Sequence, residues 1–141
     1  MDPRTPGGVA GRDRVLDRLL EAQAAYYVFT GAWPLVHRRS FERVTGPKSD
    51  YWLVQTVGLL VLSLGAALAY GVRRGGPAPE TRFAAVTAAV GLAGIDVVHV
   101  ARRRISPVYL ADAVVELLLV AGSLRGIRAR ARASRRPGFI D

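Results

Sequence analysis

Three carboxyl side chains and one imidazole interrupt two apolar stretches near the end of the sequence. The segment from residue 93 to residue 120 joins two apolar runs by a short polar turn, and it contains Asp96, His99, Asp112 and Glu116. A charged side chain in the hydrocarbon interior of a membrane costs at least about 2.5 kcal/mol, so such residues face a partner, a cavity or water. The position of these four residues therefore predicts a polar cluster inside a helical bundle.

The turn "RISPV" indicates how deep each acid lies. With Ser106 as N-cap and Pro107 as the first helical residue, the two flanking helices are expected to run antiparallel. Asp96 and Glu116 then each lie ten positions from residue 106, which is about 15 Å along a helix. We therefore expect Asp96 to meet Glu116 near the centre of the bilayer, with His99 beside them.

Neighbouring acids in such a place suggest several kinds of chemistry. Two carboxyl groups close together in a low dielectric cannot both ionise cheaply, so one should hold a proton near neutral pH. The pair can share a proton structurally, carry protons, bind a cation or metal with His99, or protonate and orient a ligand. Structural alternatives stay open for two residues. His99 can be a hydrogen-bonded bundle residue, and Asp112 can be neutralised by Arg102, Arg103 or Arg104.

The rest of the sequence argues against a metal centre and against the common catalytic sets. Asp96 and His99 have the i, i+3 spacing of metal-binding helices, but a di-metal bundle takes ligands from all four helices. The earlier apolar segments offer only Gln55, Thr56 and Ser63 at central positions. Cysteine is absent, no serine has a convincing histidine base, and no phosphate-binding glycine loop occurs. We therefore expect no catalytic residue, no metal and no cofactor.

The elements that must position the acids are apolar helices. Trp52 to Val72 and Phe83 to Ala101 are long enough to cross a hydrocarbon core of about 30 Å. Val108 to Leu124 and a segment starting near Val15 complete the set. We predict an all-α fold: an integral membrane four-helix bundle with an amphipathic N-terminal extension. The expected parts are a disordered segment 1–14, a bundle 15–125 with spans 15–37, 51–72, 82–101 and 107–125, and a basic tail 126–141.

Small residues recur at helical spacing within the expected spans. Gly65 and Ala69 are four positions apart, as are Ala85, Ala89 and Ala93. In lipid, this spacing lets helix backbones approach closely. We expect both faces to pack against other helices, and the alanine face continues into the first acid of the cluster.

The net charge of +9 is distributed as topology signals rather than as a nucleic-acid-binding surface. The N-terminus, the 73–82 loop and the C-terminus carry thirteen basic residues, against seven in the two other loops. This asymmetry predicts cytoplasmic termini. The excess of arginine over lysine hints at a bacterial genome, and hence at the inner membrane. Within the tail, Arg128, Arg132 and Arg135 share a helical face that can bind anionic headgroups or a partner; a simple stop-transfer cluster is the alternative.

One segment gives the chain a family resemblance. "SFERVTGPKSDYW" follows the first span and leads into "QTVGLL", and a polar residue lies late in the third span. In these features, in length and in its four spans, the chain resembles the small DoxX-like group of bacterial membrane proteins. The resemblance implies a fold, and no catalytic residue is carried over from it.

These observations predict one function and leave an alternative. The first is a non-enzymatic accessory or interaction subunit of a larger membrane complex or homo-oligomer, held by its small-residue faces, with the bilayer and other membrane subunits as partners. The alternative is a membrane enzyme or carrier that uses the Asp/Glu/His cluster for proton, cation or lipid-ligand chemistry. A groove that reaches Asp96 and Glu116 would favour the alternative, whereas a dry, packed pair would favour a structural role.

Overall fold

The protein is all-helical in the part that the computed structural model describes, which is residues 7–74 and 78–134, with side chains for 14–74 and 78–128. The helices are α1 (Gly7–Val36), α2 (Arg38–Thr45), α3 (Tyr51–Arg73), α4 (Pro79–Ala101) and α5 (Tyr109–Ser134). Of the four expected spans, α3 and α4 are long enough and apolar enough to cross a membrane.

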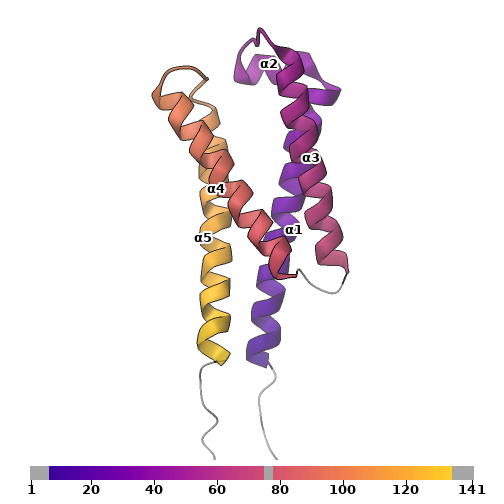
Figure 1. Cartoon of the computed structure of the whole chain (residues 1–141), viewed down its shortest axis with the longest axis vertical. Coiled ribbons are helices and arrows are strands. Elements are labelled where there is room, and N and C mark those ends of the chain that lie inside the picture. Colours follow the sequence, from indigo (N-terminus) through magenta and orange to yellow (C-terminus); the bar gives the residue numbers. More distant parts are fainter. Residues whose placement is uncertain (1–6, 75–77, 135–141) are drawn as a thin grey trace, which may run out of the picture.

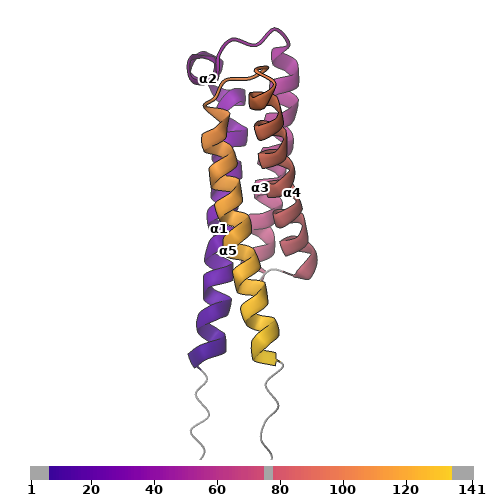
Figure 2. The ribbon, with the colours of Figure 1, turned by 90° about the vertical axis from the view of Figure 1, so that its left-hand side faces the viewer.

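The long helices form two hairpins. α1 packs along α3, α4 packs along α5, and α1 also contacts α5. Figure 1 shows α4 running away from α3 toward the end of the molecule where α2 lies. At the opposite end, the start of α1 and the end of α5 extend past the end of α3 and the start of α4, and Figure 2 shows the same arrangement from the side.

Small residues let α1 and α3 approach closely. A Cβ atom at Gly31 would lie 2.6 Å from the Gly58 carbonyl oxygen, and one at Gly58 would lie 2.8 Å from the Gly31 oxygen. Seven residues further along α3, a Cβ atom at Gly65 would lie 2.9 Å from the Ala24 oxygen. Because these distances are too short for a real side chain, the helix spacing here requires glycine.

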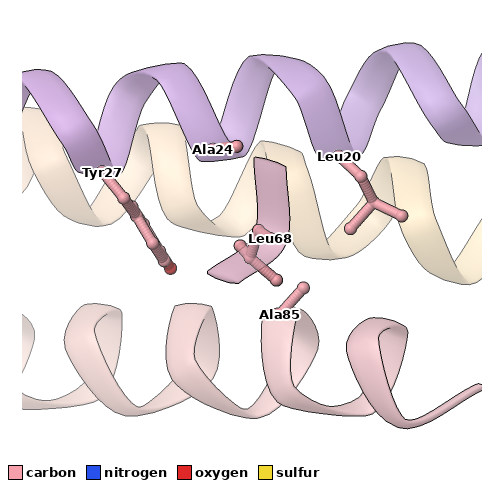
Figure 3. Close-up of a cluster of buried hydrophobic side chains, with 5 residues drawn as sticks. All are labelled: Leu20, Ala24, Tyr27, Leu68 and Ala85. Carbon is pink, nitrogen blue, oxygen red and sulfur yellow. The ribbon is translucent and has the colours of Figure 1, made fainter. Parts of the chain in front are cut away.

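The alanine face of α4 lies inside the bundle. Ala85, Ala89 and Ala93 are buried on the same side of α4 as Asp96. Where α1, α3 and α4 meet, a buried apolar cluster, shown in Figure 3, consists of Leu20, Ala24, Tyr27, Leu68 and Ala85. Ala69 is partly buried against this cluster. The face of α4 that carries Asp96 is therefore turned toward α1 and away from the outer surface of the bundle.

Helix ends differ from those expected from the sequence. α1 begins at Gly7, inside the segment expected to be disordered, and α5 continues to Ser134, inside the expected tail. Hydropathy marks only the apolar part of a helix, whereas arginine and alanine also favour helix and extend it. α5 begins at Tyr109 and not at Pro107, because residues 106–108 form a turn in which the Tyr109 amide donates to the Ser106 carbonyl at 3.1 Å.

Candidate functional site

Glu116 is held by a hydrogen-bonded chain that crosses three helices. The Tyr27 hydroxyl on α1 donates to Glu116 Oε2 on α5 at 2.9 Å. Gln23 Nε2, one turn earlier on α1, donates to the Tyr27 hydroxyl at 3.0 Å and to the Ala85 carbonyl of α4 at 2.8 Å. All three side chains are almost completely buried. A buried chain of this kind orients its terminal carboxyl group.

Asp112 lies between a tyrosine and a second carboxyl group. The Tyr26 hydroxyl donates a hydrogen bond to Asp112 Oδ1, and Asp96 on α4 lines the same cavity as Asp112. Glu116 lines this cavity too, so three carboxyl groups from α4 and α5 meet at one site.

No hydrogen bond joins Asp96 to Glu116 among the described residues, and Glu116 is bonded to Tyr27. α4 ends at Ala101 and α5 begins at Tyr109, so Asp96 is level with a position between Asp112 and Glu116. The sequence prediction considered only the hairpin of α4 and α5. In the folded chain α1 also packs against α5 and supplies a tyrosine hydroxyl to each acid of that helix.

The basic side chains that were expected near the acids have other environments. The ring Nδ1 of His99 lies 2.9 Å from the Ile95 carbonyl oxygen of its own helix, although the side chain lines the same cavity as the acids. The arginines at 102–104 are exposed. Asp112 therefore has Tyr26 as its hydrogen-bond partner, in place of the arginine proposed from the sequence.

A cavity of about 560 Å³ lies beside the acids. All five helices contribute to its walls, which are mostly apolar and aromatic. Leu53 and Val57 on α3 and Ile95 on α4 line the cavity, yet they are 47%, 54% and 58% exposed. The cavity therefore reaches the outer surface between α3 and α4, where these helices run apart (Figure 1).

Two buried carboxyl oxygens beside this cavity have no hydrogen-bond donor among the described residues. They are Asp96 Oδ2 and Glu116 Oε1, on side chains that are 8% and 1% exposed. A buried polar atom without a partner costs about 1–3 kcal/mol. Because Glu116 lines the cavity, a bound molecule can supply the missing donor.

The short helix α2 closes the end of the cavity. Trp33 Nε1 on α1 donates to Ser40 Oγ of α2 at 2.8 Å. After α2, Lys48 Nζ donates to the Thr45 carbonyl at 2.9 Å and lies 5.3 Å from the centre of the Tyr109 ring. Partial burial lowers the pKa of the Lys48 ammonium group. These contacts tie α2 to α1 on one side and to α5 on the other.

Sequence reasoning missed the polar residues of α1. Gln23, Tyr26, Tyr27 and Thr30 recur at three- and four-residue intervals within an otherwise apolar segment. This periodicity is the signal that would have found them, because it places them on one helix face. In the tail, Arg128 is exposed, whereas the side chains of Arg132 and Arg135 lie outside the described residues.

Comparisons of the chain with protein-family models, with curated proteins and with solved structures find no match. The resemblance to DoxX-like proteins therefore stays a prediction from the sequence. Within the described residues, no three His, Asp or Glu side chains lie where they could jointly hold a metal ion. The carboxyl groups, tyrosine hydroxyls and imidazole that line the cavity can exchange protons, form hydrogen bonds and bind positive charge.

Proposed function

We propose that this chain is an integral membrane protein that binds a small lipid-soluble ligand in the cavity beside its acids, as a carrier or an enzyme. The observation that carries this proposal is Glu116 Oε1, a buried carboxyl oxygen that has no donor among the described residues and lies beside a cavity of about 560 Å³. Ligand pockets commonly have volumes of about 300–1,000 Å³ and apolar walls with few polar groups. The cavity has both properties.

A membrane location is supported by the side chains that face outward. Large apolar side chains such as Phe29, Leu60, Phe83 and Leu118 are more than 60% exposed on four different helices. The buried polar side chains include Gln23, Asp96, Glu116 and Ser123. In water this arrangement would leave large apolar patches unburied, whereas lipid accommodates them. α3 and α4 supply two apolar spans.

We further propose that α1 and α5 are the other two spans of a bacterial inner-membrane protein with cytoplasmic termini. Their hydropathy is lowered by residues such as Gln23 and Glu116, which are buried in the bundle and do not meet lipid. The start of α1 and the end of α5 extend beyond the end of α3 and the start of α4 (Figures 1 and 2). The thirteen-to-seven asymmetry of basic residues supports the orientation.

The other candidate is a non-enzymatic accessory subunit of a larger complex or homo-oligomer. The sequence favours this function because its small-residue faces could bind the helices of a partner. Those faces are occupied within the chain, since Gly65 contacts α1 and the alanines of α4 are buried. Partner helices would have to use the outward apolar side chains instead. The cavity therefore gives the ligand-binding proposal the stronger support.

The test is purification from native membranes in mild detergent, followed by mass spectrometry of the molecules that remain bound. We expect the wild type to retain a small apolar compound in addition to phospholipid. Ala111→Phe, which fills the cavity at a lining position, should lose it. Glu42→Gln is the matched control, because Glu42 lies on α2 in an exposed contact with Arg38. A folded wild type without any such compound, or equal retention by Ala111→Phe, would contradict the proposal.

A further inference from the structure

We propose that the ligand is a lipophilic organic cation, such as an alkylammonium compound. Its charged group would bind beside Glu116 and the Asp96–Asp112 pair, and its apolar tail would leave through the opening between α3 and α4. This inference rests on the proposed ligand site and adds the chemical class of the ligand. It uses three features of the cavity: its charge, its aromatic lining and its opening.

The first feature is the sign of the charge around the cavity. Three carboxyl groups line it, and no lysine or arginine does so among the described residues. The other titratable side chains that line it are Tyr26 and Tyr27 on α1, His99 on α4 and Tyr109 on α5; α3 contributes none. Lys48 near the rim is engaged with the Thr45 carbonyl. A carboxylate in this apolar setting therefore requires positive charge from the ligand or a proton.

Aromatic rings are the second feature. Five aromatic side chains line the cavity: Tyr26, Tyr27, Trp33, Phe41 and Tyr109. The face of an aromatic ring attracts a cation, and the attraction grows where water is excluded. Trp33 and Phe41 lie edge to face, with ring centres 5.5 Å apart. Carboxyl groups together with aromatic rings form the surroundings in which proteins hold organic ammonium groups.

The third feature is the shape of the site. Its acidic groups lie at the buried end, since Glu116 is 1% exposed, whereas Leu53, Val57 and Ile95 line the exposed edge between α3 and α4. A ligand that reaches from the buried acidic end to the exposed apolar edge needs a polar head and an apolar tail. The described residues provide no cluster of three metal-binding side chains, and this favours an organic cation over a metal ion.

Protons and the cation compete for the same carboxyl groups. The ammonium N–H groups donate to carboxylate oxygens, including Glu116 Oε1, which has no donor among the described residues. A carboxyl group that carries a proton must first lose it to solvent, after which the ligand's charge balances the carboxylate. Acid therefore competes with the ligand, and affinity should fall as the pH is lowered.

The experiment compares decylamine, decanol and decanoate, which share a tail and differ in the head, on protein in phosphatidylcholine nanodiscs. Trp33 lines the cavity and can report binding by fluorescence once the exposed Trp52 is replaced by Phe. Empty nanodiscs correct for partition into lipid. We expect decylamine to bind at least tenfold more tightly than decanol, and decanoate more weakly than either. Lowering the pH should weaken only the amine.

Variants assign the effect to the acids. Glu116→Gln and Asp112→Asn keep the size of each side chain and an acceptor for its tyrosine, and each should remove the preference for amine over alcohol. Glu42→Gln, which changes an acid that is not among the described residues lining the cavity, should retain the preference. Equal binding of decanol and decylamine would overturn the cation assignment and leave the ligand site standing. If no probe binds at all and Ala111→Phe changes nothing, the ligand site itself is wrong.

Discussion

The buried hydroxyl group of Tyr27 both accepts and donates a hydrogen bond within the protein. It accepts from Gln23 and donates to Glu116, and its side chain has no exposed surface. Each of the partners is itself buried, so neither can replace the lost bond with water. A single hydroxyl on α1 therefore determines the orientation of an acid on α5, and the effect should be measurable as stability.

Tyr27→Phe should lower the free energy of unfolding by about 1–3 kcal/mol, because it leaves Glu116 without its donor. Equilibrium unfolding in mixed micelles measures the change. Tyr70→Phe is the matched control, since Tyr70 is 62% exposed and keeps its ring next to Arg74; it should change stability by less than about 0.5 kcal/mol. Equal stability of the Tyr27 variant and the wild type would show that the bond contributes nothing.

Two substitutions at Glu116 distinguish the loss of its charge from the loss of its hydrogen-bond acceptor. Glu116→Gln keeps an acceptor for the Tyr27 hydroxyl and should fold with nearly the stability of the wild type. Glu116→Leu removes the acceptor and should cost about 1–3 kcal/mol, because the tyrosine O–H is then buried without an acceptor for its hydrogen. Thermal unfolding followed by circular dichroism gives the comparison. The hydrogen-bond account would be refuted by a Leu variant as stable as the Gln variant.

Among the helices, α1 and α3 depend most on glycine. Gly31 and Gly58 face each other so closely that each backbone lies where the other's Cβ atom would be. In contrast, Gly91 and Gly94 on α4 have open space at their Cβ positions. Glycine is therefore required for close helix contact between α1 and α3, whereas the glycines on the outer face of α4 make no such contact.

Gly31→Ala should destabilise the bundle by about 1–3 kcal/mol, because the new methyl group would lie 2.5 Å from the Leu62 amide nitrogen and the helices must separate. Gly91→Ala should be neutral or stabilising, since alanine favours helix by about 1 kcal/mol over glycine. Both variants are measured in the same detergent by equilibrium unfolding. Similar effects of the two substitutions would mean that close approach is unimportant for α1 and α3.

For the whole molecule, the positions of the helix ends bear on the proposed membrane topology. The start of α1, the end of α3, the start of α4 and the end of α5 lie toward one end, and α2 lies at the other (Figure 1). The proposed four spans require this arrangement. Thirteen of the twenty basic residues belong to the N-terminus, the 73–82 loop and the C-terminus.

Single cysteines can test this topology, because the chain contains no cysteine of its own. Ser134→Cys at the end of α5 and Ser49→Cys before α3 should react with an impermeant thiol reagent from opposite sides of sealed vesicles. The basic asymmetry predicts that residue 134 is cytoplasmic. Labelling of both positions from the same side would rule out the four-span arrangement.

The sequence by itself determined the elements that local patterns encode. Continuous apolar runs predicted α3 and α4, and four-residue spacing placed the alanines and Asp96 on one face of α4. The presence of acids within apolar runs predicted that they would be enclosed, and Asp96 and Glu116 are buried. These inferences succeed because hydropathy and helical periodicity depend on neighbours along one segment.

Only the tertiary structure decided which partners the acids have. The tyrosines that bond Asp112 and Glu116 come from α1, more than eighty residues earlier in the chain. Their meeting depends on how far each helix is rotated and on the close approach of α1 and α3 at Gly31 and Gly58. The divergence of α3 from α4, which opens the cavity, is likewise a property of the assembled bundle. Such relations arise from packing between distant segments, and no pattern within one segment encodes them.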